Sequence, residues 1–301
     1  MVFLIETKVI QLDFDLIMFC LSNNLTMNIG VDLGGTKIKV GIAKEGLILE
    51  QSTALLLQKD SLTATIRQLK ELIRPHVTEN ISKIGIGVPS VVDTERGIVY
   101  NVTNIPSWEK VALKDILEDE FNLPTFVNND VNCFTLGEHL FGQAKGYASV
   151  VGLTVGTGLG SGIIIDNKLY KGFNCGAGEI GLLKYLTKNY EYYLGNSFFE
   201  RHFRLNAQEA FIAAQDGNKW ALDAYSEFGL HLGAAIEAVM YTYDPEVVVI
   251  GGSISHAFSF FEKTMHETLK EFEFPQSLKN IKILKSKNNN IALLGAAALC
   301  P

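Results

Sequence analysis

The residues best suited to chemistry near the start of the chain lie in a glycine turn that follows an apolar run. Asp32 comes near the end of that run, and Gly34, Gly35, Thr36 and Lys37 follow it. Backbone N–H groups beside glycine, together with a hydroxyl, can approach phosphate oxygens closely. A carboxylate at a strand end can bind a metal ion held on those phosphates. A tight hairpin with a surface acid is the alternative interpretation.

A second copy of this pattern lies in the other half of the chain. Residues 151–158 align with residues 29–36 without a gap. Its turn contains Thr154, Gly156, Thr157 and Gly158. After each turn the apolar residues alternate at the period of a half-buried strand, whereas a Walker loop or a Rossmann turn opens into a helix. The two hairpins therefore predict a duplicated α/β domain with phosphate loops that face each other across a cleft.

The remaining residues alternate between predicted strands and helices. Strands are expected at 47–49, 83–88, 125–127 and 246–250, and helices at 62–73 (capped by Ser61), 111–121, 131–141, 220–243 and 291–299. The strand at 125–127 delivers Asn128, Asn129 and Asp130 to its carboxyl end. Ligands bind at that end of the strands in open α/β sheets.

Asp130 is the candidate general base. Phosphoryl transfer from a nucleoside triphosphate needs loops for the phosphates, an acid for the metal and a base on the acceptor hydroxyl. The helix predicted after Asp130 has a dipole that favours an ionised carboxylate at its start, and the neighbouring amides could bind sugar hydroxyls. The alternative is that Asp130 only caps this helix.

Composition excludes several classes of function. With 301 residues the chain suits two domains, and its net charge of -7, without a basic tract, argues against a nucleic-acid surface. No uninterrupted apolar run is long enough to span a bilayer. The cysteines (Cys20, Cys133, Cys175 and Cys300) form no CxxC pair, which is typical of reduced thiols. We therefore expect a cytoplasmic protein that binds neither nucleic acid nor membrane.

Residues 1–26 form a separate, uncertain extension. Their apolar stretches are interrupted by charged residues, and the small-residue cleavage site of a signal peptide is missing. Met27 stands directly before the first predicted strand. The preferred interpretation is a start codon assigned too early, and an added amphipathic element is the alternative.

From about residue 27 to its end, the sequence resembles the ROK family of sugar kinases and repressors, which have the actin-like (ribonuclease H-like) ATPase fold. The two phosphate motifs of the family resemble residues 32–37 and 154–162, and its sugar-side segment resembles residues 87–93 and 104–108. Its Asn-Asp pair corresponds to residues 129–130, and its Gly-Glu-Ile-Gly segment to residues 176–181. Its adenosine motif is similar to residues 251–253, and its ending to residues 293–298. The resemblance implies two domains around a cleft. The smaller covers 27–128 and is completed by a C-terminal helix at 288–301, and the larger covers 129–287.

The resemblance also implies the ligands and the site residues. ATP and Mg²⁺ would be the cofactors, with Mg²⁺ bridged to Asp32. Asp130 would be the catalytic base, and Asn104, Asn129 and Glu179 would bind the sugar. The residues expected to hold the nucleotide are Asp32, Gly34, Gly35, Thr36, Lys37, Thr154, Gly156, Thr157, Gly158, Gly251 and Gly252. A homodimer is the expected assembly.

The sequence departs from the family after residue 181. The family places there a histidine that binds sugar and zinc, followed by a zinc-ligating cysteine motif, whereas this chain has Leu182 and no such motif. We therefore expect no zinc. Aromatic residues replace the motif, at Tyr185, Tyr190, Tyr192, Tyr193, Phe198 and Phe199. Core packing is the preferred interpretation of these aromatics, and a sugar-stacking platform is the alternative.

A family glutamate that contacts the sugar follows the cysteine motif. If the zinc loop has been deleted, Glu191 takes that place, with Glu200 as its rival and a solvated loop acid as the third interpretation. The expected function is ATP-dependent phosphorylation of a hexose or hexose derivative, glucokinase-like. Kinases of N-acetylmannosamine, N-acetylglucosamine or β-glucosides are alternatives, and a non-catalytic sugar-sensing regulator is an alternative of another class. The family's repressors carry a helix-turn-helix domain ahead of the first phosphate motif, and only 26 residues precede Met27.

Overall fold

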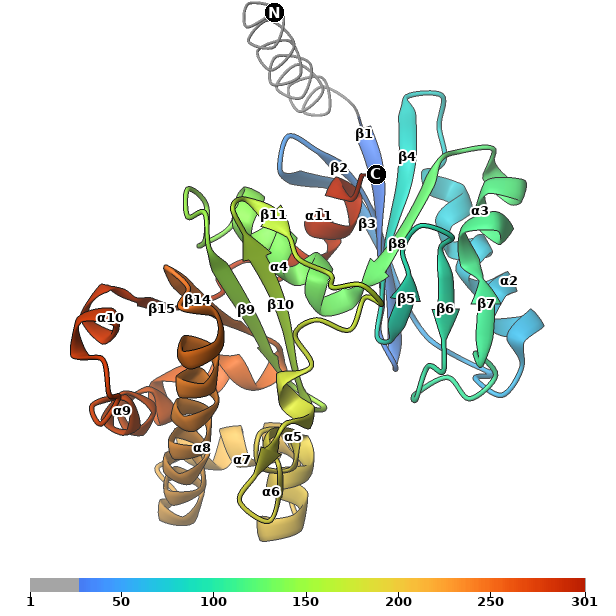
Figure 1. Ribbon diagram of the computed structural model, residues 1–301. Helices are drawn as coiled ribbons and strands as arrows, with labels where there is room; N and C mark the ends of the chain where they lie inside the picture. Colours follow the sequence, from blue (N-terminus) through green and yellow to red (C-terminus); the bar gives the residue numbers. More distant parts are fainter. Residues whose placement is uncertain (1–26, 301) are drawn as a thin grey trace, which may run out of the picture.

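The first of two five-stranded sheets contains the first glycine turn. The computed structural model describes residues 27–300, so the expectation about residues 1–26 lies outside the described residues (Figure 1). The strands of this sheet are β1 (Met27–Leu33), β2 (Lys37–Lys44), β3 (Leu47–Leu55), β4 (Ile81–Val88) and β8 (Thr125–Asn129). They lie in the order β3-β2-β1-β4-β8, with β1, β4 and β8 parallel and β2 and β3 antiparallel to their neighbours.

The second sheet repeats this arrangement. Its strands are β9 (Val150–Val155), β10 (Leu159–Ile165), β11 (Lys168–Leu169), β14 (Val247–Gly251) and β15 (Lys282–Lys285), in the order β11-β10-β9-β14-β15. Again a hairpin opens the unit, its first strand pairs parallel with a later strand, and that strand pairs parallel with the next. The predicted duplicated α/β fold is therefore confirmed.

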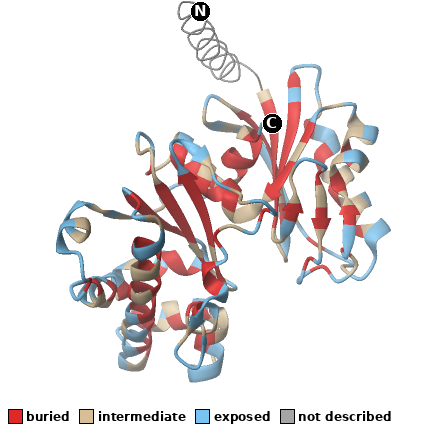
Figure 2. Ribbon diagram, viewed as in Figure 1, coloured by how far each residue is buried: buried red, intermediate tan, exposed pale blue. Residues whose placement is uncertain are grey.

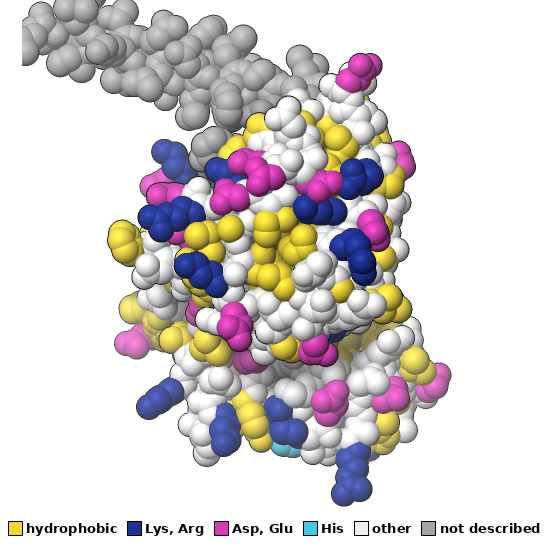
Figure 3. Space-filling view, turned by 90° about the vertical axis from the view of Figure 1, so that its right-hand side faces the viewer, with side chains coloured by type: hydrophobic (Ala, Val, Ile, Leu, Met, Phe, Trp, Pro, Cys, Tyr) yellow, Lys and Arg dark blue, Asp and Glu magenta, His cyan; other side chains and the backbone are white. Residues whose placement is uncertain are grey.

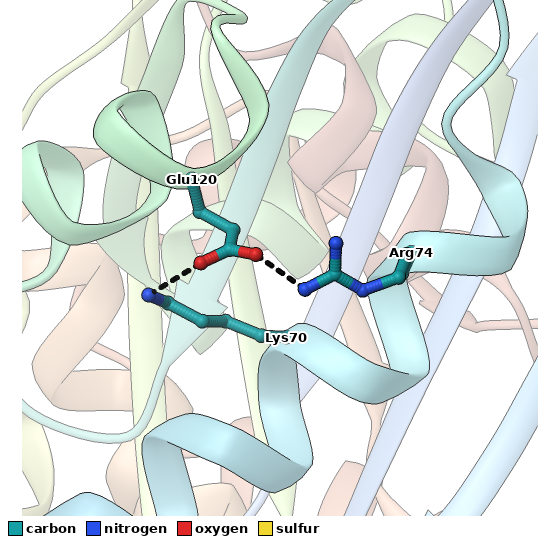
Figure 4. Close-up of polar contacts among 3 residues, drawn as sticks. All are labelled: Lys70, Arg74 and Glu120. Atoms are coloured by element: carbon teal, nitrogen blue, oxygen red, sulfur yellow. Dashed lines mark hydrogen bonds and ion pairs between the residues drawn. The ribbon is translucent and has the colours of Figure 1, made fainter.

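Two helices, α2 (Leu62–Ile73) and α3 (Leu113–Phe121), accompany the first sheet. The side chain of Ser61 accepts a hydrogen bond from the N–H of Ala64, as expected of a helix cap. A 3-10 turn, η1 (Arg74–His76), follows α2. Glu120 of α3 joins the two helices, because it accepts hydrogen bonds from Lys70, at 2.9 Å, and from Arg74 (Figure 4). These bonds, the one from Lys70 first, lower the pKa of Glu120.

The predicted helix at 111–121 begins two residues later than expected. Val111 and Ala112 belong to β7 (Lys110–Ala112), which pairs with β6 (Ile98–Tyr100), and β6 pairs with β5 (Val91–Asp93). The physical reason is that Val111 is buried in this small sheet, where a β-branched side chain packs well.

Helices α4 (Asp130–Phe141) and α11 (Ile291–Ala298) lie between the two large sheets (Figure 1). Helix α4 packs on β9 and β10, and α11 packs on α4, β1 and β4. The two helices touch backbone to backbone, since a Cβ added to Gly295 would lie 1.8 Å from the carbonyl oxygen of Cys133. The last helix of the chain, α11, therefore packs against the first sheet.

The helices of the second half form a separate layer on the second sheet. They are α5 (Tyr190–Tyr193), α6 (Asn196–Phe203), α7 (Ala207–Gln215), α8 (Lys219–Tyr243), α9 (Phe258–Leu269) and α10 (Pro275–Asn280), with the 3-10 turns η2 (Ile180–Leu182) and η3 (Ser253–Ala257) and the small hairpin of β12 (Lys184–Tyr185) and β13 (Lys188–Asn189). Figure 2 shows that the buried residues gather in the strands and on the inner faces of the helices.

The aromatic residues after position 182 contribute to this core. Phe198 and Phe199 are fully buried, and Tyr190 is 9% exposed. The rings of Tyr185 and Tyr190 stack with centroids 4.4 Å apart. The interpretation as core packing is therefore confirmed for Phe198, Phe199 and Tyr190.

Charged side chains of both signs lie on one face of the molecule. On the face shown in Figure 3, Lys and Arg side chains are interspersed with Asp and Glu. Positive charge thus does not gather there, as it would on a nucleic-acid-binding face. Within residues 27–300, we find no helix with the length and apolar character needed to cross a membrane.

Candidate functional site

A cavity of about 470 Å³ is lined by residues of both large sheets and of helices α4 and α11. This volume lies in the range of ligand pockets, about 300–1,000 Å³. The polar residues that line it are Asp32, Lys39, Asp130, Thr154, Ser253, Ser255, His256, Ser286, Asn288 and Asn289, together with Gly251 and Gly252. Five residues expected at the site from the sequence (Asp32, Asp130, Thr154, Gly251 and Gly252) are thus in one wall.

Asp130 is the first residue of α4 and does not cap it. The cap is Asn129, whose side-chain oxygen accepts from the N–H groups of Val131, at 2.9 Å, and Asn132, at 3.2 Å. The interpretation of Asp130 as a helix cap is therefore wrong. Its carboxylate accepts only from the adjacent N–H of Val131 among the bonds found in residues 27–300.

The surroundings of Asp130 suit a proton acceptor. Burial, first, and then the charge of Asp32 raise the pKa of Asp130 to about 7, with a smaller contribution from Glu179. A general base works best when its pKa lies near the operating pH. An aspartate with the usual pKa of 3.8 would accept a proton only weakly near neutral pH.

Asp32 lies opposite Lys39 across the β1–β2 hairpin, and both line the cavity. Burial raises the pKa of Asp32, and the charge of Lys39 lowers it. Carboxylate oxygen is a ligand that Mg²⁺ prefers, and Mg²⁺ in phosphate-transfer sites takes further ligands from the substrate and water. No group of three or more His, Cys, Asp or Glu residues within 27–300 could hold a metal by itself. The carboxylate of Asp32 in the wall of the cavity therefore fits a Mg²⁺ ion whose other ligands come from a substrate and water.

The first glycine turn lies against Asn104. A Cβ added to Gly35 would lie 2.6 Å from the Cβ of Asn104, so glycine is required for this contact. Asn104 belongs to the segment between β6 and β7, which the buried Ile105 and Trp108 anchor. The indole N–H of Trp108 donates to Thr65 Oγ1 at 2.7 Å. The turn and a residue expected to bind sugar are thus neighbours.

The residues of this turn do not themselves line the cavity. Within the described chain, Gly34, Gly35, Thr36 and Lys37 are absent from its wall, and Thr36 and Lys37 are exposed. The lysine in the wall is Lys39, which sequence analysis missed. The signal was present, because residues i and i+2 of a strand share a face and Lys37 was already a candidate.

The second glycine turn lies against Glu191. A Cβ added to Gly158 would lie 2.2 Å from Glu191 Oε2, so the carboxylate rests on the turn. The turn itself is closed by a hydrogen bond from the N–H of Gly156 to the carbonyl oxygen of Gly158 at 3.0 Å. Gly156, Thr157 and Gly158 are again outside the wall of the cavity in the described chain.

Glu191 and Glu179 lie close enough for the charge of one to act on the other, and within the described chain neither lines the cavity. Burial raises the pKa of Glu179, and the charge of Glu191 raises it further. Since Glu179 in turn affects Asp130, the acids expected to bind the sugar and the expected base form one electrostatic group. Both Glu191 and its rival Glu200 are exposed, and Glu200 lies on α6, where it accepts a hydrogen bond from Asn196.

A crossing segment, residues 170–179, brings Glu179 to the first sheet. Lys171 Nζ donates to Thr94 Oγ1 at 2.7 Å, and Cys175 is buried in the core of the first half. The thiol of Cys175 donates to Asn128 Oδ1 at 3.6 Å, and Asn132 Nδ2 donates to the same oxygen at 2.9 Å. The segment therefore spans from β11 to the strand end that carries Asn129 and Asp130.

Several residues of the wall were missed by sequence analysis. Ser286, Asn288 and Asn289 follow β15, and Ser255 and His256 belong to η3. Ser286 and the two asparagines are polar residues at the carboxyl end of a strand, which is the signal that could have found them. His256 carried no such signal.

The repeated sheet, the paired glycine turns and the shared cavity define a two-domain protein of the actin-like ATPase superfamily. The sequence model of the ROK family matches residues 28–301, and the chain belongs to that family.

Both enzymes and regulators are among its relatives. A glucokinase of Thermotoga maritima is 29% identical over 304 residues, which cover 90% of this chain and 96% of that protein. A xylose repressor of Caldicellulosiruptor bescii is 28% identical, covering 90% of this chain and 77% of the repressor. The crystal structure of a ROK family glucokinase from Streptomyces griseus, in complex with glucose and AMPPNP, superposes with a TM-score of 0.79, at 26% identity, over 91% of this chain and 99% of that one.

Proposed function

We propose that the protein is a kinase that transfers the terminal phosphoryl group of ATP to a hydroxyl of a hexose or hexose derivative. The observation that carries the proposal is Asp130. Asp130 lies at the start of α4 in the wall of the cavity, and its pKa is raised to about 7. The cap of α4 is its neighbour, Asn129. The glucokinase relatives support the same class of reaction.

In this proposal Asp130 accepts the proton of the attacking hydroxyl. Asp32 would hold Mg²⁺, which would neutralise charge on the phosphates when bound. The two glycine turns would contribute backbone N–H groups from beyond the wall of the cavity, apart from the N–H groups of Gly34 and Gly156, which donate to carbonyl oxygens within their own turns. Movement of the two halves toward each other would exclude water and limit hydrolysis of ATP.

The sugar would be held by Asn104, Glu179 and Glu191, with a smaller part for Asn129. The side-chain oxygen of Asn129 is already used in the cap, and its Nδ2 donates to the carbonyl oxygen of Ser90 at 3.3 Å. At most one N–H of Asn129 remains for a ligand. We therefore assign Asn129 mainly to the placement of Asp130.

A non-catalytic, sugar-sensing regulator is the second candidate, because a xylose repressor is among the relatives. That function needs a sugar site and no general base. The test is a coupled assay of ADP release with glucose, N-acetylmannosamine, N-acetylglucosamine and β-glucosides, with Asp130→Asn as the matched variant.

We expect turnover with at least one of these sugars, and a decrease of about 10²–10⁴ in turnover for Asp130→Asn, the usual share of a general base. Sugar affinity should stay within a few fold. Sugar binding without ADP release in the wild type would favour the regulator. A variant that keeps most of its turnover would remove Asp130 from the mechanism.

A further inference from the structure

We propose that Tyr185 and Tyr190 position Glu191 by anchoring the short helix α5 to helix α8. This inference rests on the proposed function, in which Glu191 binds the sugar, and it assigns a positioning role to the hydroxyl groups of two tyrosines. Both tyrosines belong to the aromatic segment that follows Leu182. Their rings pack in the core of the second half, and their hydroxyl groups serve the site.

The hydroxyl groups of the two tyrosines meet one turn of α8. The hydroxyl of Tyr185 lies 3.1 Å from Nδ1 of His231, and the hydroxyl of Tyr190 donates to the carbonyl oxygen of Ala234 at 3.2 Å. Residues three apart in a helix are neighbours on its surface, so the two contacts lie close together. Burial raises the pKa of both tyrosines, and their hydroxyl groups therefore stay protonated near neutral pH and can donate.

His231 is suited to accept the proton of the Tyr185 hydroxyl in a hydrogen bond. Burial lowers the pKa of His231, which favours the neutral ring, although the charge of Glu227 acts in the opposite direction. A neutral imidazole with its proton on Nε2 accepts a hydrogen bond at Nδ1. Glu227 Oε1 lies 3.7 Å from Nε2, and a carboxylate on that side of the ring favours this tautomer.

The stacked rings connect this anchor to Glu191. The rings of Tyr185 and Tyr190 have centroids 4.4 Å apart and planes 13° apart, so a movement of one ring disturbs the other. The N–H of Tyr190 also donates to the carbonyl oxygen of Leu183 at 3.2 Å. Glu191 is the next residue of α5, and its carboxylate lies against the second glycine turn at Gly158. The place of this carboxylate is therefore set by the contacts of Tyr190 with α8.

Helix α5 is too short to hold Glu191 by itself. It has four residues, and isolated helices shorter than about 12 residues are marginal in water. The side chain of Asn189 caps its start, because it accepts from the N–H of Tyr192 at 2.9 Å. Glu191 is exposed, so burial does not hold it in place. The two tyrosine hydroxyl groups supply the fixed geometry that a sugar-binding carboxylate needs.

The experiment removes the hydroxyl groups and keeps the rings. Tyr185→Phe, Tyr190→Phe and the double variant are compared with the wild type, all as the full chain. Tyr225→Phe is the matched control, because its hydroxyl also donates to a carbonyl oxygen in the same core, that of Ala207 in α7, at 2.8 Å. Hydrogen exchange of peptides that cover α5 measures its local opening, and the Tm shows whether each variant is folded.

We expect each single change to speed exchange in α5 by about 2- to 12-fold, the equivalent of one hydrogen bond, and the double variant to combine both effects. The sugars are those of the ADP-release assay, with Kd from calorimetry. For a sugar that binds, the double variant should raise KM and Kd by up to about 10-fold, because a displaced carboxylate keeps part of its hydrogen bond. Tyr225→Phe should lower the Tm and change neither quantity.

A combination with Glu191→Ala tests whether the tyrosines act through Glu191. If they do, Tyr185→Phe and Tyr190→Phe should cause no further loss of sugar affinity in the Glu191→Ala background, since residues that act as a unit are not additive. Losses that multiply would overturn the inference. Should the double variant not fold, each single variant is compared in the same way.

The contrary results can be told apart. Unchanged exchange in the double variant would show that the hydroxyl groups do not anchor α5. Faster exchange with an unchanged sugar Kd and KM would show that the anchor does not position Glu191. If the wild type binds one of the sugars without releasing ADP, the kinase proposal fails, and the Kd still decides this inference. If it binds none of them, the sugar-binding role of Glu191 and this inference fail together.

Discussion

Asp130 combines two properties at the scale of the single residue, burial and proximity to other acids. Each disfavours its charged form, so the carboxylate holds a proton more tightly than a surface aspartate does. This makes the residue a better proton acceptor near neutrality, and it ties the stability of the protein and its proposed activity to pH.

The first prediction concerns the pH dependence of catalysis. Asp130 must be ionised to accept a proton, and its pKa is raised to about 7 by burial and by Asp32. We therefore expect kcat/KM to fall on the acid side of a midpoint near pH 7. The measurement is a kcat/KM profile between pH 5 and pH 9. An acid limb with its midpoint near pH 4 would show that Asp130 has an ordinary pKa.

The raised pKa of Asp130 also determines whether the stability of the protein rises or falls with pH. The folded chain keeps the proton of Asp130 up to about pH 7, whereas the unfolded chain releases it near 3.8. The stabilisation present at low pH is thus lost as the pH rises through this window. In Asp130→Asn this loss is absent, so the variant should gain in Tm relative to the wild type as the pH rises from about 4 to about 7. An equal pH dependence of Tm in both proteins would contradict the shift.

The second prediction concerns Glu191, which rests on the turn at Gly158 beside Glu179. We expect Glu191→Ala to lower kcat/KM for the sugar by about 10- to 150-fold, because a hydrogen bond to a charged group is lost. Glu200→Ala is the matched control, since Glu200 is exposed like Glu191 but is bonded to Asn196 and is not found against the turn at Gly158. Equal kinetics for both variants would mean that Glu191 is a solvated loop acid.

At the scale of the element, the start of α4 depends on Asn129. Its side chain satisfies two N–H groups of the first turn and so fixes where Asp130 points. A cap of this kind contributes about 0.5–2 kcal/mol to stability. The helix and the proposed catalytic residue Asp130 are thus linked through the side-chain amide of Asn129.

The third prediction follows from this link. Asn129→Ala should lower the free energy of unfolding by about 1 kcal/mol, because the cap is lost. Asn129→Ser can still cap and should recover most of that stability, although it lacks the N–H that meets Ser90. Chemical denaturation measures both. If Asn129→Ala is as stable as the wild type but binds the sugar poorly, the main role of Asn129 is to bind the sugar and not to cap α4.

At the scale of the whole molecule, the two halves are held by more than the α4–α11 contact. The crossing segment buries Cys175 beside Asn128 and links Lys171 to Thr94. It lies next to the place where the resemblance to the family breaks off, at Leu182, which is 60% exposed. The packed aromatic residues that follow stabilise this part of the molecule.

The fourth prediction is that folding of this region does not need zinc. Phe198, Phe199 and Tyr190 are packed into the core of the second half, where burial of each contributes about 1.5–3 kcal/mol. Metal analysis of the purified protein should find no stoichiometric zinc, and chelators should leave the Tm unchanged. One zinc per chain, or a large loss of Tm on chelation, would contradict this, since structural zinc contributes roughly 10–16 kcal/mol to folding.

The sequence by itself determined the duplicated sheet and the place of Asp130. Both glycine turns lie between alternating apolar runs, and alternation is a local pattern that fixes which residues face the core. Asp130 could be found because it follows a short apolar run at a strand end. The boundary at Val111 was missed because a three-residue strand and the start of a helix look alike in sequence.

Only the tertiary structure decided which neighbouring residues serve the site. Asn129 and not Asp130 caps α4, Lys39 and not Lys37 reaches the cavity, and Glu191 and not Glu200 lies on the second turn. In each pair the two residues are of similar chemical type. What separates them is their position relative to a distant strand, turn or cavity wall, and that position is set by the register of the hairpin and by packing between segments far apart in the chain.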